Sequence, residues 1–267
     1  MSTSAKTSTV VVEVAGQVAT IRINRADKRN AVDQSTRLAL LRAFDSILGR
    51  CTAVVLTGTG SAFCAGVDLK ESHAMREAGM TPDPAASWEK VNLAIREHPA
   101  IFIAAVNGIA LGGGSTLINV CDLAVAAEDA QIGMPEIGFA MYPKLAGPAG
   151  QKALSRKRAA WMILTGQRIS GRTAESWGMV NICCPAAEVL AQAHALAEQV
   201  ARFDPFALAE SKRALDYIPD VVSDWKQMFD YGEKVNAVIR GGTSAQRAGM
   251  SRFFEGERNP GQGQGQA

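Results

Sequence analysis

The sequence lacks the residue patterns of a disulfide framework or a zinc site. Its 267 residues contain five cysteines, none in a CxxC pair, and three histidines, none in an HExxH motif. Closely spaced Cys and His ligands are the usual mark of protein zinc sites. Most of the cysteines lie in apolar runs, which is typical of reduced core residues in a cytosolic protein. We therefore expect no disulfide, no metal site and a cytoplasmic location.

The chain also lacks a strong excess of charge of either sign. Its net charge is +2 and its pI is about 8.3, so no basic stripe points to nucleic acid or to an acidic membrane surface. The uncharged run 100–121 is not expected to be a membrane helix. Asn107-Gly108 is a turn signal, and each glycine of a triple run would weaken a helix interior by about 1 kcal/mol. We expect neither nucleic acid nor a membrane as a partner.

Phosphate-binding loops are missing as well. The segment Gly58-Thr59-Gly60 is not followed by the third glycine of a dinucleotide-binding loop, because Phe63 occupies that place, and no Walker pattern occurs. The first nine residues are polar and lack the apolar centre of a secretory signal. The low-complexity tail PGQGQGQA follows Asn259. We predict that residues 1–9 are disordered and that residues 259–267 form a flexible tail.

What is present is a chain with 47% hydrophobic residues, enough to bury a large core in one domain. Alternation predicts a β-hairpin over 10–14 and 18–23, and apolar runs predict strands at 53–57, 101–106, 123–126 and 181–184. Cap residues predict helices after Asp33, Ser170 and Asp204. The helix after Asp33 has an apolar stripe of Leu38, Leu41, Phe44, Ile47 and Leu48.

Further helices are predicted over 186–201, 220–240 and 243–254. The pattern indicates an α/β core over 10–200 and a helical C-terminal region over 201–258, where we expect subunits to pack.

The stretch 101–136 carries the clearest chemistry. An apolar strand enters an Asn107-Gly108 turn, three glycines at 112–114 open a helix, and a single carboxylate follows at Glu136. Backbone N–H groups at a glycine turn can hold a carbonyl oxygen, and a nearby carboxylate can move a proton. Taken alone, a glycine run can be a simple tight turn and a Pro-Glu pair a surface turn.

Three segments in order resemble the enoyl-CoA hydratase/isomerase (crotonase) superfamily. They are NRADKRNAV at 24–32, SAFCAGVDLKE at 61–71, and AAVNGIALGGG with CDLAVAAEDAQIGMPEIG at 104–138. TGQRISGRTAESWGMVN at 165–181 adds to the similarity, which runs from about 10 to 260. The resemblance implies a crotonase-like spiral of ββα repeats that ends in a helical oligomerisation region. It also implies a homotrimer or a hexamer built as a dimer of trimers.

The same resemblance implies an acyl-CoA thioester as substrate and no permanently bound cofactor, CoA being part of the substrate. The backbone N–H groups of Val67 and Gly113 would form the oxyanion hole, and each such donor is worth about 3 kcal/mol in comparable sites. Glu136 would be the acid/base carboxylate, with a pKa raised by an apolar pocket. The CoA nucleotide would lie near six residues, namely Lys28, Arg29, Ala65, Asp68, Leu69 and Lys70.

Three positions, in two segments, depart from the family pattern. Hydratases of this family carry a second glutamate twenty residues before the first, and here that place holds Thr116. A hydroxyl is no base near neutral pH, although it can hold water or substrate by hydrogen bonds. After the Pro135-Glu136-Ile137 segment, Lys144 and Leu145 stand where the family has small residues. Together with Met141 and Thr116, they are expected to shape the acyl pocket. Lys144 can equally point to solvent.

Three functions remain open from the sequence. The first is one-carboxylate chemistry by Glu136, either double-bond isomerisation or hydration and retro-aldol cleavage. The second is a conventional enoyl-CoA hydratase in fatty-acid or aromatic-acid degradation. The third is a non-catalytic acyl-CoA-binding homologue, against which the retained Glu136 argues.

Overall fold

The computed structural model describes residues 8–81 and 83–257, and it contains two sheets. The larger sheet has the order β1-β2-β3-β5-β7-β9, in which only β1 is antiparallel to its neighbour. Its strands are β1 Val10–Ala15, β2 Val18–Ile23, β3 Ala53–Gly58, β5 Ile101–Val106, β7 Leu123–Ala127 and β9 Ile182–Cys184. The predicted hairpin and the four predicted strands are therefore confirmed.

A second, smaller sheet consists of three short parallel strands in the order β4-β6-β8. They are β4 Ala62–Cys64, β6 Ile109–Leu111 and β8 Ile132–Gly133. Each follows a strand of the large sheet along the chain, so the pairs β3-β4, β5-β6 and β7-β8 repeat one unit and form the predicted spiral. From their residues, the segments AFCAGVDL at 62–69 and ALGGG at 110–114 were expected to be loops, so the strands that begin them were missed. Strands of two or three residues are too short to show an alternating pattern.

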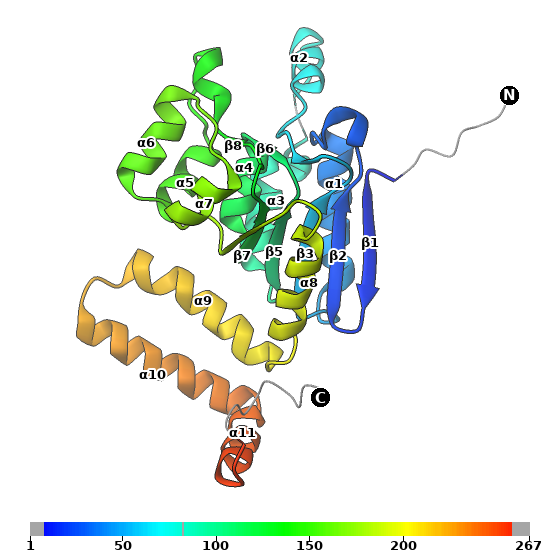
Figure 1. Ribbon diagram of the computed structural model, residues 1–267. Helices are drawn as coiled ribbons and strands as arrows, with labels where there is room; N and C mark the ends of the chain where they lie inside the picture. The colour runs from blue at the N-terminus through cyan, green and yellow to red at the C-terminus, as the bar shows by residue number, and fades with distance from the viewer. Residues whose placement is uncertain (1–7, 82, 258–267) are drawn as a thin grey trace, which may run out of the picture.

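Helices cover both faces of the large sheet (Figure 1). Helix α8 contacts β3, β5 and β7 on one face, and α1 lies on the other. The helices of the core are α1 Gln34–Ile47, α2 Leu69–Glu77, α3 Trp88–Glu97, α4 Gly113–Val120, α5 Ala146–Ala153, α6 Arg156–Thr165, α7 Gly171–Trp177 and α8 Val189–Val200. The described residues also contain three short 3-10 helices, which are η1 Ala26–Lys28, η2 Pro84–Ala86 and η3 Pro135–Phe139.

The predicted cap residues are confirmed. Asp33, Ser170 and Asp204 accept hydrogen bonds from the backbone N–H groups of Thr36, Thr173 and Ala207, at 2.8, 3.1 and 2.8 Å. The stripe predicted for α1 needs a correction. Phe44 and Ile47 are buried, but Leu48 caps the helix end and is 55% exposed.

The C-terminal helices project below the core in Figure 1. They are α9 Pro205–Val221, α10 Trp225–Gly242 and α11 Ala245–Phe254. The helix predicted over 220–240 was misplaced, because α9 continues through Pro219 and Asp224 caps α10 by accepting the Gln227 N–H at 3.1 Å.

Helix α9 is fastened to the core by Lys212, which donates to the carbonyl oxygens of Ile95 and Ala100 and pairs with Asp122 at 2.9 Å. Of the segment 1–9 that was predicted to be disordered, residues 1–7 lie outside the described residues, whereas the Thr9 carbonyl oxygen accepts the Asn24 N–H at 2.8 Å. The predicted tail at 259–267 also lies outside the described residues.

Candidate active site

The small sheet delivers the three predicted catalytic groups to one place. β4 runs into the turn that contains Val67, β6 runs into the glycine run with Gly113, and β8 runs into η3, which contains Glu136. The carboxyl ends of parallel strands meet at the same edge of a sheet, as in other α/β binding sites. Segments far apart in the sequence therefore converge here.

The Val67 turn is held from one side only. The Val32 N–H donates to the Gly66 carbonyl oxygen at 2.8 Å, and the Asp68 N–H donates to the Val32 carbonyl oxygen at 3.0 Å. In a parallel bridge of this kind Val67, which lies between the two bonded residues, directs its own N–H away from the Val32 segment. The Val67 N–H accordingly points away from Val32 and donates to no acceptor among the described residues.

The three glycines of the run are required for different reasons. Gly112 has a φ of +52°, and a Cβ there would lie 2.8 Å from Glu136 Oε1. A Cβ at Gly113 would lie 2.7 Å from the indole nitrogen of Trp88, and one at Gly114 only 1.9 Å from the Cys64 carbonyl oxygen. The absence of side chains lets the backbone of this turn approach its neighbours closely.

The two turns that carry the predicted donors touch each other. A Cβ at Gly66, whose φ is +93°, would lie 2.7 Å from the Leu111 carbonyl oxygen and 3.1 Å from the Gly113 nitrogen. Gly113 is the first residue of α4, so its N–H has no partner within the helix, and among the described residues it donates to no acceptor. Both predicted oxyanion donors therefore lie at one junction, next to the positive end of α4.

Glu136 is half-buried on η3, with one carboxylate oxygen beside Gly112. Its Oε2 is buried and has no hydrogen-bond partner among the described residues. No other carboxylate oxygen of those residues is both buried and unpartnered. Burial raises the pKa of Glu136 above its ordinary value of 4.5, and a hydrogen bond from its own backbone N–H opposes the shift only in part. A carboxyl group of this kind is suited to proton transfer near neutral pH.

Thr116 is 2% exposed, and its hydroxyl donates to the Gly112 carbonyl oxygen at 3.3 Å. Gly112 thus contacts Thr116 on one side and Glu136 on the other. Thr116 therefore supplies a hydroxyl, and no titratable group, next to the glycine run, and its place in the acyl pocket stays a prediction.

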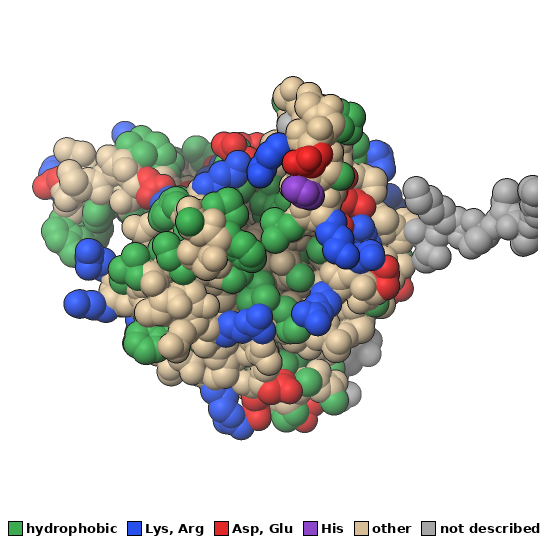
Figure 2. Space-filling model, turned by 90° about the horizontal axis from the view of Figure 1, so that it is seen from above, with side chains coloured by type: hydrophobic (Ala, Val, Ile, Leu, Met, Phe, Trp, Pro, Cys, Tyr) green, Lys and Arg blue, Asp and Glu red, His purple; other side chains and the backbone are tan. Residues whose placement is uncertain are grey.

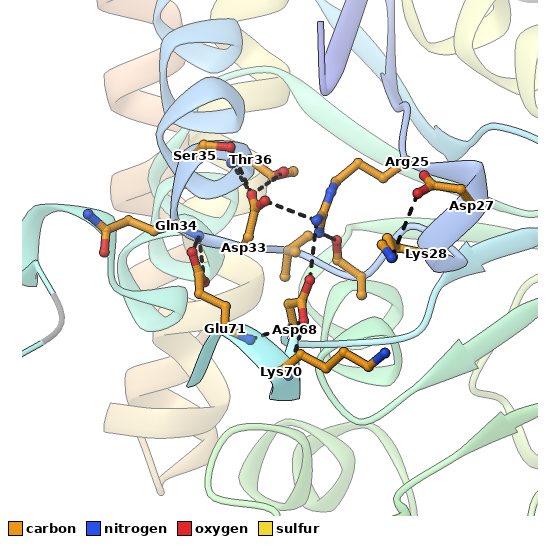
Figure 3. A network of polar contacts seen from close by, with 12 residues as sticks. Arg25, Asp27, Lys28, Asp33, Gln34, Ser35, Thr36, Asp68, Lys70 and Glu71 are labelled. Carbon is orange, nitrogen blue, oxygen red and sulfur yellow. Dashed lines mark hydrogen bonds and ion pairs between the residues drawn. The ribbon is translucent and has the colours of Figure 1, made fainter. Parts of the chain in front are cut away.

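A polar network supports the Val67 turn (Figure 3). Arg25 pairs with Asp33 at 3.0 Å and with Asp68 at 3.2 Å, so it links the cap of α1 to the cap of α2. Glu71 of α2 accepts the Gln34 N–H at 2.9 Å. The Arg25 pair holds Asp68 on one side of Val67, and the Val32 N–H holds the Gly66 carbonyl oxygen on the other side. Together they fix the direction of the Val67 N–H.

The residues predicted to contact CoA lie on these same turns. Lys28 and Lys70 extend from the network on the side away from Gln34 (Figure 3), and both are exposed. Arg29 has a left-handed backbone conformation, and its carbonyl oxygen accepts the Ala65 N–H at 3.0 Å. Leu69 is 57% exposed. The Asp68 carboxylate, in contrast, is occupied by Arg25 and by the backbone N–H groups that open α2.

The predicted pocket residues after Glu136 differ in their surroundings. Met141 and Lys144 are exposed, whereas Leu145 packs against the core. The face onto which the parallel strands point has hydrophobic side chains near its centre, with Lys and Arg side chains at several places around them (Figure 2). Such a surface suits a ligand with an apolar part and a negatively charged part.

Sequence reasoning missed Trp88, the first residue of α3, which contacts the glycine run from outside. Its only sequence signal is a tryptophan directly after the Ser87 cap, and that pattern usually means a core residue.

Among the described residues, no group of three or more His, Cys, Asp or Glu side chains could hold a metal ion. Within the same residues, no helix is both long and apolar enough to cross a membrane.

Comparisons with known proteins identify the family. Residues 13–260 match the family described as enoyl-CoA hydratase/isomerase. The chain is 34% identical to mevalonyl-coenzyme A hydratase of Aspergillus fumigatus, over 74% of each chain. It is 30% identical to hydroxycinnamoyl-CoA hydratase-lyase of Pseudomonas fluorescens, over 84% of this chain and 83% of that one.

A solved structure shows the same fold. The crystal structure of enoyl-CoA hydratase from Bacillus anthracis superposes with a TM-score of 0.83 at 30% identity, covering 92% of this chain and 96% of that chain. With the family match over most of its length, the chain belongs to the enoyl-CoA hydratase/isomerase (crotonase) family of enzymes.

Proposed function

We propose that this enzyme acts on an acyl-CoA thioester through a single acid/base carboxylate, Glu136. The thioester oxygen would bind between the Val67 and Gly113 N–H groups, where it becomes negatively charged as the enolate forms. Preorganised backbone donors stabilise such a charge without having to reorganise. The observation that carries the proposal is the buried, unpartnered Glu136 Oε2 beside Gly112, with a hydroxyl at Thr116 in place of a second carboxylate.

The reaction that needs only these groups is isomerisation between 3-enoyl-CoA and 2-enoyl-CoA. The Glu136 carboxylate removes a proton from the α carbon, and the electron pair of that C–H bond forms the enolate. The enolate then collapses so that the double bond lies between the α and β carbons, while the carboxylic acid returns the proton to the γ carbon. Protons and electrons balance with no further reactant.

Addition of water by the same carboxylate is the second candidate. It is favoured by the names of the two relatives, a hydratase and a hydratase-lyase, at 34% and 30% identity. In this reaction Glu136 would deprotonate water as it adds to the β carbon and would then protonate the α carbon. Thr116 would contribute a hydrogen bond to that water and no proton of its own.

The binding of CoA is proposed for the exposed side chains of Lys28, Arg29 and Lys70 and for the backbone near Ala65 and Leu69. Two lysines extending from neighbouring turns on the same side of the polar network suit a nucleotide phosphate (Figure 3). Asp68 would act there through its backbone and as the partner of Arg25. Leu145 and Thr116 are proposed to line the acyl pocket, with Met141 and Lys144 at its exposed rim.

A homotrimer, or a hexamer of two trimers, is proposed for the assembled enzyme. Support comes from large apolar side chains that are exposed on the C-terminal helices, namely Leu215, Val221, Trp225, Phe229 and Phe254. Exposed apolar groups in such number usually mark a surface that another subunit covers.

The deciding experiment incubates the enzyme with panels of 2-enoyl- and 3-enoyl-CoAs in D2O and follows the products by mass spectrometry. Isomerisation predicts a 2-enoyl product of unchanged mass apart from deuterium. Hydration predicts a gain of one water, and lyase chemistry predicts a shortened acyl-CoA. No conversion of any thioester, with no binding of CoA, would contradict the proposal.

A further inference from the structure

The Trp88 side chain carries a buried hydrogen-bond donor that the proposed reaction has not yet used. Trp88 is 7% exposed, and its indole nitrogen has no partner among the described residues. A buried tryptophan N–H usually finds an acceptor, because an unpaired buried donor costs free energy. The indole cannot accept a hydrogen bond at this atom, so what it lacks is an acceptor.

The position of this donor is defined by the glycine run. A Cβ built at Gly113 would lie 2.7 Å from Trp88 Nε1 and 3.2 Å from its Cε2. The same point is 3.3 Å from the Gly66 α carbon. The N–H edge of the indole therefore meets the junction of the two turns that carry Val67 and Gly113.

The backbone of Trp88 is held firmly where α3 begins. The Ser87 hydroxyl caps the helix by accepting the Lys90 N–H at 3.1 Å, and the Asn92 side chain donates to the Trp88 carbonyl oxygen at 2.6 Å. Helix α3 also packs against α4, which begins at Gly113. A donor fixed in this way is preorganised for a ligand that enters the junction.

We propose that the indole N–H of Trp88 is a third hydrogen-bond donor to the thioester oxygen of the bound acyl-CoA, beside the Val67 and Gly113 N–H groups. This inference rests on the proposed function. It accounts for the missing acceptor, which the substrate supplies. It also gives a second reason for glycine at 113, since a side chain there would displace the indole. The indole does not titrate near neutral pH, so it adds a donor and no second acid or base.

The direct test is an NMR titration of uniformly 15N-labelled protein, in which the four tryptophan indoles and the backbone amides are observed together. Trp88→Phe assigns the resonance of interest. The first ligand is butyryl-CoA, and the matched ligand is S-butyl-CoA, a thioether that lacks only the carbonyl oxygen. The Trp88 indole proton is expected to move downfield with butyryl-CoA and to stay nearly unmoved with the thioether, because only the former offers an acceptor.

The outcomes separate this inference from the function on which it rests. If butyryl-CoA shifts the backbone resonances of Val67 and Gly113 while the Trp88 indole responds equally to both ligands, the third donor is refuted and the oxyanion site stands. If neither ligand shifts any resonance, both proposals fail.

Kinetics supply a second measurement. Trp88 is replaced by β-(3-benzothienyl)alanine, in which sulfur takes the place of the N–H and the ring shape is kept. A loss of roughly 10- to 100-fold in kcat is expected, with little change in KM, because the bond strengthens as charge develops on the oxygen. The same replacement at Trp161, which is 47% exposed, is the control and should leave kcat unchanged. Full activity of the Trp88 analogue would overturn the proposal.

Discussion

Glu136 and Lys212 are both titratable groups withdrawn from water, but their surroundings differ. Lys212 is 3% exposed and donates to the Ile95 and Ala100 carbonyl oxygens while pairing with Asp122. Glu136 has a buried oxygen with no partner, next to two backbone N–H groups and an indole N–H that also lack acceptors. A buried charge with all its hydrogen bonds made stabilises the packing of the helices around it. Buried polar groups that lack partners and lie close together, in contrast, form a place where a ligand can supply the missing hydrogen bonds.

The polar network around Arg25 shares features with both regions. Its members are paired with one another, as in the Lys212 region, yet it directs the unpaired Val67 N–H. The site therefore consists of a few polar groups without hydrogen-bond partners, held in place by the paired side chains of the Arg25 network. This comparison leads to tests that remove one group at a time from each region.

The largest effect is expected for Glu136→Gln. Removal of the only proposed base should lower kcat by about 10³- to 10⁴-fold, because general acid–base catalysis contributes on that scale. Binding of CoA and the free energy of unfolding should be nearly unchanged, as measured by calorimetry and urea denaturation. Glu97→Gln, on the exposed side of α3, is the control. Equal rates for wild type and Glu136→Gln would refute the assignment.

In the satisfied region, Lys212→Met should act on stability alone. Loss of the buried cation leaves Asp122 short of a partner, and the free energy of unfolding should fall by about 3 kcal/mol in urea denaturation. Lys226→Met is the matched control, because its side chain is 82% exposed and its pair with Asp230 is worth less than about 0.5 kcal/mol. Similar losses in both variants would show that Lys212 does not fasten α9 to the core.

Gly112→Ala tests the contact between the glycine run and the carboxylate. The new methyl group would lie 2.8 Å from Glu136 Oε1, so kcat should fall roughly 100-fold as the carboxylate moves out of position. Gly79→Ala has a similar positive φ but no atom within 4 Å. Both variants should lose about 1 kcal/mol of stability from backbone strain. Activity lost equally in both would mean that strain alone is responsible.

The dependence on pH should follow the raised pKa of Glu136. The active base is the ionised carboxylate, so kcat/KM should rise up to tenfold per pH unit below that pKa and level off above it. Because burial raises this pKa, the inflection should lie above 4.5. A pH-rate profile at constant ionic strength measures it, and an inflection at or below 4.5 would contradict the buried carboxylate.

The smallest effect is expected for Thr116→Val. If Glu136 alone carries the proton, loss of the hydroxyl should change the rate by less than about fivefold and leave the products unchanged. Thr57→Val is the control, since Thr57 is also buried and donates to a backbone carbonyl, that of Ala105. A 100-fold loss confined to hydration would show instead that Thr116 positions the water.

Prediction from the sequence succeeded where the signal is local. The caps at Asp33, Ser170 and Asp204 act over three residues, and the buried strands of the large sheet show as apolar runs. It failed where the signal is short or depends on surroundings. The strands β4, β6 and β8 have too few residues for a pattern, and the break between α9 and α10 was misplaced at Asp220. Trp88 was passed over because its neighbours in sequence say nothing about Gly113.

The sequence by itself determined the strands of the large sheet, the glycine turns, several of the helices, the family, and the single carboxylate at Glu136 with a hydroxyl at Thr116. Only the tertiary structure decided which polar groups are left without partners, and that the unpaired groups of Gly113, Trp88 and Glu136 lie around one glycine run. The physical reason is that hydrophobic patterns and caps are interactions between near neighbours. An unpaired N–H at Val67, Gly113 or Trp88, in contrast, depends on every segment that the fold packs around it.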